Sequence, residues 1–298
     1  MRKLHSFIFG ALALGTIAAC TNNIDPSTDT NAIYQSNLAD ISTYAASKGL
    51  NGKSTNTGLY YAISKPSNSS IATAIGQEVE LNYTLYSLTK STGNPSVIVD
   101  RKVDSTYATT SLYGPLTESN SGLIEGLMYM HEGDQAVLLL PSLLAFGNQS
   151  AYNGLVPANS PVRFDVTLKR ARTEDQQINE YMTANKLTPT EVTSSGLRFI
   201  KTLDNSTGAT PTATQTLIVK YKGKLLRSVS AFDSTGTGTY PTTIGKSIAG
   251  FDEGLSKLKV GEKATIILPS KIGYGTTGYQ QIPPYAPMRF DIELVSVQ

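Results

Sequence analysis

The chain of 298 residues has little of the chemistry used in metal sites and covalent catalysis: one Cys, two His and no Trp. A single Cys excludes an intramolecular disulfide and any site built from several thiolates. Two His leave little room for a histidine-based metal centre, so we expect neither a metal nor a cofactor. The 25 basic and 23 acidic residues nearly balance, which gives no sign of nucleic-acid binding.

The N-terminus, by contrast, has a distinct pattern. Residues 1–19 contain a basic start, Arg2 and Lys3, followed by an apolar stretch too short to span a membrane. This pattern predicts an export signal. Two alanines precede Cys20, and small residues before a cysteine resemble a bacterial lipobox, in which the cysteine is acylated and becomes the new N-terminus. The alternative is an ordinary export signal with a cysteine nearby.

Cleavage before Cys20 would change the chemistry that remains. Removal of two basic residues and His5 leaves a body without net charge, in which His131 is the single histidine. A lipid-bearing Cys20 cannot act as a nucleophile, so Cys–His catalysis is excluded and any Ser–His–Asp triad must use His131. His131 shortly precedes Gly133 in a predicted turn, and we expect it to be a surface residue.

Membrane attachment is therefore expected through the lipid, because the neutral body offers no surface charge for it. Residues 20–35 are polar and include Pro26, which predicts a tether. No Asp directly follows Cys20, a feature that favours the outer membrane. We expect an exported lipoprotein of the outer membrane that faces the periplasm.

The rest of the chain contains an internal repeat. The offset between matching segments falls in steps from 138 to 126 residues, as loops of unequal length between equivalent strands would produce. We therefore expect two copies of one domain, over 36–172 and 173–298. The clearest pairs are Thr57-Gly58-Leu59 with Ser195-Gly196-Leu197, Glu125-Gly126-Leu127 with Glu253-Gly254-Leu255, Leu140-Pro141-Ser142 with Leu268-Pro269-Ser270, and Arg163-Phe164-Asp165 with Arg289-Phe290-Asp291.

Hydrophobic periodicity predicts the same layout in each copy. Apolar residues at helical spacing around Ile41 and Ile178 predict a short helix at the start of each copy. Strict alternation over 290–294 predicts a strand with one buried face. The apolar residues of 250–258 fall on one side of a helix. The predicted fold class is α+β, with an antiparallel β-sheet wrapped on a short α-helix and preceded by a further short helix.

The second copy carries an ordered set of short motifs. They are Val219-Lys220-Tyr221-Lys222-Gly223, Phe232-Asp233-Ser234, Gly250-Phe251-Asp252-Glu253-Gly254-Leu255, Gly273-Tyr274-Gly275, Ile282-Pro283-Pro284 and Phe290-Asp291-Ile292-Glu293-Leu294. In this order and spacing they resemble the FKBP-type peptidyl-prolyl isomerases over about residues 196–298, and the first copy resembles the same family more weakly, over about 58–171. The resemblance implies tandem FKBP-like domains that rotate X–Pro bonds in proline-containing polypeptides without a cofactor.

The resemblance also implies a role for each residue of the second site. Phe251 would form the pocket floor, where members of the family often carry Trp. The Tyr274 hydroxyl and the Ile248 N–H would donate hydrogen bonds to substrate carbonyls, and Asp233 would form a polar edge. Alternation along the strands would also bury some of these aromatic residues as ordinary core, and that alternative stays open. The implied walls are Tyr221, Phe232, Ile282 and Phe290, with Tyr240 as a further wall in a shortened loop.

The first copy keeps Tyr83 and Asp104 but departs from the motif in the pocket. We therefore expect it to be weakly active or inactive, and to serve as a scaffold or peptide-binding module. Its degenerate site comprises Val103, Leu123 and Phe146 in place of Phe232, Phe251 and Tyr274, Asn120 near the position of Ile248, and Val156 and Phe164.

Taken together, these features predict an isomerase that assists protein folding in the bacterial cell envelope, with its activity mainly in the second copy. Its expected partners are proline-containing polypeptides and the membrane, with no nucleic acid and no metal. A non-catalytic FKBP-fold chaperone or peptide-binding lipoprotein is the main alternative. A structural or glycan-binding envelope lipoprotein is a third possibility, supported only by the anchor and the 16 Tyr.

Overall fold

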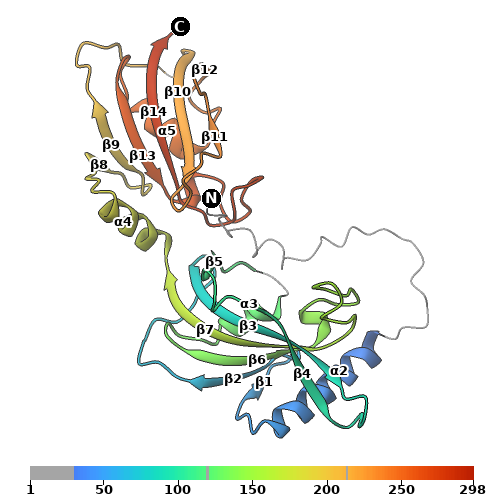
Figure 1. Cartoon of the computed structure of the whole chain (residues 1–298). Coiled ribbons are helices and arrows are strands. Elements are labelled where there is room, and N and C mark those ends of the chain that lie inside the picture. The colour runs from blue at the N-terminus through green and yellow to red at the C-terminus, as the bar shows by residue number, and fades with distance from the viewer. Residues whose placement is uncertain (1–29, 119–120, 213) are drawn as a thin grey trace, which may run out of the picture. The chain divides into compact units, whose positions relative to one another are not determined.

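The computed structural model describes residues 30–118, 121–212 and 214–298. The chain divides into two compact units, of which unit one ends at Ala171 and unit two runs from Arg172 to Gln298 (Figure 1). Cys20, the expected export signal and Asn120 lie outside the described residues. Across the described ranges, no helix has the length and apolar character needed to cross a membrane.

Unit one is built on a seven-stranded antiparallel sheet with strand order β1-β2-β6-β7-β3-β4, in which β5 also pairs with β3. Its helix α3 packs on one face of this sheet and α2 on the other (Figure 1). The elements are α2 (Thr30–Ser47), β1 (Lys53–Ser54), β2 (Tyr60–Lys65), β3 (Glu78–Lys90), β4 (Ile98–Ser105), β5 (Leu112–Pro115), α3 (Gly122–Leu127), β6 (Gln135–Leu140), the 3₁₀ turn η1 (Ser142–Leu144) and β7 (Val162–Arg172).

Unit two repeats this arrangement. Its sheet has the order β11-β10-β14-β13-β9-β8, with β12 paired to β10, which is the order of unit one read from the other edge. The predicted α+β class and the duplication are therefore confirmed. The elements are α4 (Glu174–Ala184), β8 (Glu191–Val192), β9 (Arg198–Leu203), β10 (Leu217–Leu225), β11 (Asp233–Ser234), β12 (Tyr240–Thr242), α5 (Ala249–Ser256), β13 (Lys263–Leu268), η2 (Ser270–Ile272) and β14 (Met288–Val297).

The central strands are apolar on both faces because each sheet lies between two helices. In β13, Ile266 packs into the main core of unit two, on the face covered by α5. Its neighbour Ile267 points to the other face and packs with Ile178 and Met182 of α4. Successive residues of a strand face opposite sides, so a strand buried on both sides shows a continuous apolar run instead of alternation.

Helix α2 begins at Thr30, so the last six residues of the stretch 20–35 that we expected to be a tether are helical. Most of this added helix is exposed and polar, which is why its composition indicated a tether. Asn37 anchors it from the buried side: its Nδ2 donates to the Asn159 carbonyl at 3.0 Å, and its Oδ1 accepts from the Ser142 N–H at 2.7 Å.

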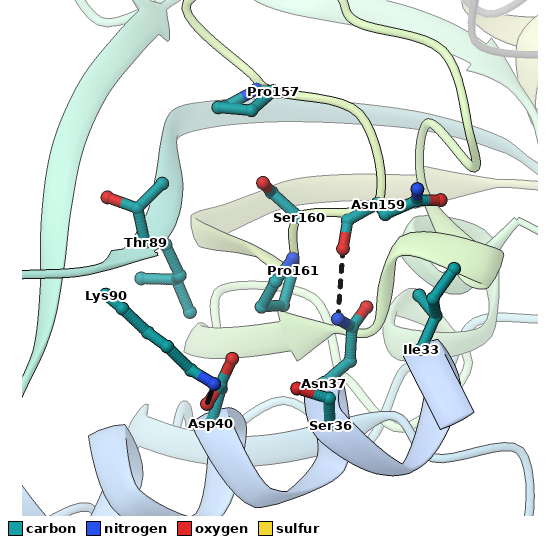
Figure 2. Close-up of a pocket in the computed structure, with 11 residues that line it drawn as sticks. Ile33, Ser36, Asn37, Asp40, Thr89, Lys90, Pro157, Asn159, Ser160 and Pro161 are labelled. Atoms are coloured by element: carbon teal, nitrogen blue, oxygen red, sulfur yellow. Dashed lines mark hydrogen bonds and ion pairs between the residues drawn. The ribbon is translucent and has the colours of Figure 1, made fainter. Parts of the chain in front are cut away.

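A cavity of about 320 Å³ lies in unit one where α2 meets the end of β3 and the loop over 157–161 (Figure 2). Polar contacts border it, including a Lys90–Asp40 ion pair at 3.6 Å and the hydrogen bond from Asn37 to Asn159. None of the described residues expected in either site lines this cavity. It marks the junction of the first helix with the sheet, and the candidate site lies elsewhere.

Candidate active site

Gly223 on strand β10 lets the aromatic residues of unit two come together. It pairs with Phe290 of β14 and with Asp233 of β11. A β-carbon at Gly223 would lie 2.6 Å from the Phe290 ring and 2.7 Å from the Phe232 ring. No side chain fits at those distances, so this glycine makes room for both rings directly above the strand.

Four aromatic rings form a connected cluster on this face. The Phe251 ring centroid lies 5.5 Å from that of Tyr221 and 5.3 Å from that of Phe290, and Phe232 lies 5.6 Å from Phe290, with each pair edge-to-face. This geometry is favourable for aromatic pairs. Phe251 and Phe290 are buried, whereas Tyr221 and Phe232 are half-buried. The cluster is therefore core at its base and open at its edge.

Polar groups border the open edge of the cluster. The Tyr221 hydroxyl donates to Asp233 Oδ2 at 2.6 Å. Burial and this hydrogen bond raise the pKa of Tyr221, while burial and the nearby Asp233 carboxylate raise the pKa of Tyr274. Both hydroxyls therefore stay protonated at neutral pH and act as hydrogen-bond donors rather than as acids.

Two donors beside the cluster are unengaged. Asp252 Oδ2 accepts from the backbone N–H groups of Gly245 and Ser247 at 2.8 and 3.2 Å, which fixes the loop that leads into α5. Throughout the part of the chain that the structure describes, the Ile248 N–H and the Tyr274 hydroxyl make no hydrogen bond. Each is therefore available to a carbonyl of a bound molecule.

The segment after η2 closes one side of the cluster. Ile282, which is buried, forms a bridge with Tyr279, and the Tyr279 ring stacks on Tyr274 at 5.3 Å. Gln281 Nε2 donates to the Phe232 carbonyl at 2.8 Å. We did not predict Tyr279 and Gln281 from the sequence, because their contacts depend on the path of the loop and no local pattern indicates them.

Tyr240 extends the aromatic wall on the other side. Tyr240 is the first residue of β12. Its ring lies edge-on to that of Tyr221, with the ring centroids 6.0 Å apart, and the residue is 46% exposed. The structure thus brings Tyr240 beside the residues expected in the second site.

The equivalent region of unit one keeps the polar pair and two of the four rings, Tyr83 and Phe164, whose centroids lie 5.6 Å apart edge-to-face. The Tyr83 hydroxyl donates to Asp104 Oδ2 at 2.6 Å. Leu85 pairs with Asp104 as Gly223 pairs with Asp233, so its side chain occupies the level at which rings lie in unit two. The other described residues of the degenerate site, Val103, Leu123, Phe146, Val156 and Phe164, all belong to or pack against the core of unit one.

The arrangement in unit two suits non-covalent binding of an apolar ring and its flanking carbonyls. The single histidine of the body, His131, lies in unit one with a side chain that is 50% exposed, beside Asp134. Within the described ranges, no three His, Cys, Asp or Glu side chains are grouped so that they could hold a metal ion. The chemistry available at the candidate site is therefore shape, apolar contact and hydrogen-bond donation.

Comparison with known proteins places these observations in a family. Residues 71–169 and 208–295 match the family described as FKBP-type peptidyl-prolyl cis-trans isomerase. The FK506-binding protein 1B of Neurospora crassa is 43% identical over 102 residues, which cover 31% of this chain and 90% of that protein. The isomerase FkpA of Aeromonas hydrophila is 37% identical over 122 residues, or 40% of this chain and 45% of that protein.

A solved structure, FkpA from Escherichia coli, matches 42% of this chain and 59% of its own, with 28% identity and a TM-score of 0.38.

Proposed function

This chain belongs to the family of FKBP-type peptidyl-prolyl cis-trans isomerases, and from that premise we propose that unit two catalyses rotation about X–Pro bonds in polypeptides. One observation carries the assignment to unit two. Its four-ring cluster is open at the edge and has two unengaged donors beside it, the Tyr274 hydroxyl and the Ile248 N–H. Unit one has neither feature in its described residues.

The reaction requires no nucleophile. Rotation of the amide bond is opposed by a barrier of about 18–20 kcal/mol, because it breaks the resonance of the peptide group. The twisted amide has less charge separation than the planar one, so an apolar surrounding favours it relative to the ground state. An enzyme that binds the twisted form more tightly than the planar form lowers the barrier by that difference.

We propose a distinct task for each residue of the cluster in unit two. The prolyl ring would lie against Phe251 and Phe290, with Tyr221 and Phe232 at its sides. The Tyr274 hydroxyl and the Ile248 N–H would hold the carbonyls that flank the proline, so that only the X–Pro bond turns. Holding the flanks fixed in this way removes rotational freedom before the reaction begins.

The test is a proline-isomerisation assay with residues 30–298, which contain both units with their cores. We expect the rate to rise linearly with protein concentration, and to fall to the uncatalysed rate when Phe251→Ala is introduced. The matched change in unit one, Leu123→Ala, should leave the rate unchanged. A wild-type rate equal to that of buffer would refute catalysis. Suppression of client aggregation without any such rate would instead favour the non-catalytic chaperone.

We propose further that the chain is an exported lipoprotein, attached through Cys20 to the outer membrane and facing the periplasm, where it assists the folding of envelope proteins. The support is the sequence pattern of residues 1–20. The test is labelling with a fatty-acid analogue in the native host, followed by membrane fractionation. Label on the wild type but not on Cys20→Ala is expected. An unlabelled wild-type chain would contradict the anchor.

A further inference from the structure

One loop of unit one differs from its counterpart in unit two. In unit one a bridge joins Ala151 to Val156, and in unit two the equivalent bridge joins Tyr279 to Ile282. The bridged segment contains six residues in unit one and four in unit two, so the loop of unit one is two residues longer. The additional length lies beside Phe146, the counterpart of Tyr274.

The backbone of this longer loop is strained. Tyr152, Asn153 and Gly154 follow one another with φ values of 52°, 55° and 84°. The left-handed region is unfavourable for residues with a β-carbon. Two such residues in succession persist only where the surrounding packing holds them, so contacts of the loop side chains must offset the strain.

The contacts of the Tyr152 side chain identify what holds the loop. Its ring lies edge-on to Phe146 at 5.8 Å and packs against the core of unit one. Burial and the Asp104 carboxylate raise the pKa of its hydroxyl, and the Tyr83 hydroxyl is a further electrostatic neighbour. Tyr152 therefore lies among Phe146, Tyr83 and Asp104.

Those three residues are the counterparts of the residues that border the open edge in unit two, which are Tyr274, Tyr221 and Asp233. The Tyr152 ring lowers the exposure of the residues around it. Tyr83 is only 1% exposed, whereas Tyr221 is half-buried. Counted from the equivalent bridges, the residue of unit two at the position of Tyr152 is Gln280, which also has a positive φ, of 50°, and is exposed.

We propose that unit one holds a second binding cleft for prolyl peptide segments, and that its own Tyr152 ring occupies this cleft. The inference rests on the proposed function, because it assigns to unit one the ligand class that unit two would take. The replacement of the Phe251 ring by Leu123 and the missing hydroxyl at Phe146 predict binding without efficient isomerisation. Removal of the Tyr152 ring should open the cleft.

The experiment uses residues 30–298 labelled with ¹⁵N and titrated with a blocked Ala-Leu-Pro-Phe tetrapeptide. In the wild type, we expect shifted amide signals in unit two alone. In Tyr152→Gly, the signals of Asp104, Phe146 and Val156 should shift as well, with a Kd within about tenfold of that of unit two. Glycine is the chosen replacement because it tolerates the left-handed φ without strain.

Two controls separate the ring from the backbone. Asn153→Gly relieves the neighbouring left-handed residue while it keeps the ring, and Tyr152→Phe keeps the ring without its hydroxyl. In neither variant should addition of the Ala-Leu-Pro-Phe peptide shift the signals of unit one. An Ala-Leu-Ala-Phe peptide should leave the signals of unit one in Tyr152→Gly unshifted, because the opened cleft requires a prolyl ring.

The outcomes distinguish this inference from the proposed function. Shifts confined to unit two in a folded Tyr152→Gly would overturn the inference and leave the function of unit two standing. Shifts in unit one alone would support the inference and refute the assignment of the site to unit two. No shift in either unit would refute both. If Tyr152→Gly loses the dispersed signals of unit one, Tyr152→Leu replaces it, and absence of binding there overturns the inference.

Discussion

The two units have the same fold but fill equivalent positions of their cores with different side chains. Where unit two has Gly223 below the rings of Phe232 and Phe290, unit one has Leu85 with Val103. Val103 is smaller than Phe232, whereas Leu85 is larger than Gly223, so the total side-chain volume is roughly kept. Cores tolerate exchanges that conserve volume, and the fold therefore survives the replacement of two of the four rings.

The polar pair behaves differently from the rings. The Tyr hydroxyl donates to the Asp carboxylate at 2.6 Å in both units, in the Tyr83–Asp104 and the Tyr221–Asp233 pairs. Because the pair is also present in unit one, where Val103 and Leu123 replace the rings of Phe232 and Phe251, its first role is to join the two neighbouring strands. The site of unit two thus combines a Tyr–Asp pair that stabilises the fold in both units with rings that only ligand binding requires.

The largest expected effect follows from removing the ring at the base of the cluster. Phe251→Ala should destabilise unit two by about 3–5 kcal/mol and Leu123→Ala should destabilise unit one by about 2–5 kcal/mol, because each opens a cavity in a core. Only the first should abolish isomerisation. Urea unfolding and the proline assay measure the two effects, and Phe251→Leu should retain a folded unit two with a reduced rate. Equal loss of rate from Leu123→Ala would remove the distinction between the units.

The next effect is a dependence of stability on pH that belongs to unit two. Glu262 is fully buried, and although burial opposes ionisation, hydrogen bonds from the Lys259 N–H and the Lys201 ammonium lower its pKa from 4.5 to about 2. Its folded-state pKa is depressed, so its contribution to stability is complete above about pH 4.5 and is lost as the pH falls toward 2.

Glu262→Gln should therefore destabilise unit two at pH 7 by about 1.5–3 kcal/mol, the range for hydrogen bonds to charged groups. It should also flatten the decline in stability between pH 4.5 and 2, measured by thermal unfolding. Glu293→Gln, which breaks the more exposed pair with Lys263 at 3.1 Å, is the matched control and should change little. An unchanged pH profile in Glu262→Gln would contradict this account.

A smaller effect is expected from making unit two resemble unit one at a single atom. Tyr274→Phe removes the hydroxyl that is absent at Phe146, and one hydrogen bond is worth about 1 kcal/mol. The isomerisation rate should fall roughly fivefold, while stability changes little because the hydroxyl has no partner among the described residues. Tyr279→Phe is the control, and should keep the full rate.

The smallest effect concerns the hydrogen bond that closes the loop. Gln281→Leu introduces the residue that unit one has at Leu155 and removes the bond to the Phe232 carbonyl. Because this contact is exposed, we expect a loss of about 0.5 kcal/mol, seen as a roughly twofold rise in KM with kcat unchanged. A large drop in kcat would instead place Gln281 among the groups that contact the reacting bond.

Much of this molecule follows from local pattern. Period-two alternation predicts β14, and the apolar spacing of residues 250–258 predicts α5, because each element buries one face of its own sequence. The repeat predicts that two units share one fold, since matching segments must pair in the same order. The Tyr and Phe residues of the second site follow from the ordered motifs, and the structure brings them together.

Other features depend on chain segments that meet only in the folded state. The start of α2 at Thr30 depends on the anchoring contacts of Asn37, and a polar composition concealed it. The hydrogen bond of Gln281, the stack of Tyr279 and the placement of Tyr152 depend on the paths of loops, where strain and side-chain contact compete. The sequence alone therefore determined the fold, which rests on short-range periodicity and the repeat, and the resemblance of its ordered motifs to a family supplied the list of aromatic residues. Only the tertiary structure decided which cleft is open, because that depends on the volume left between distant segments.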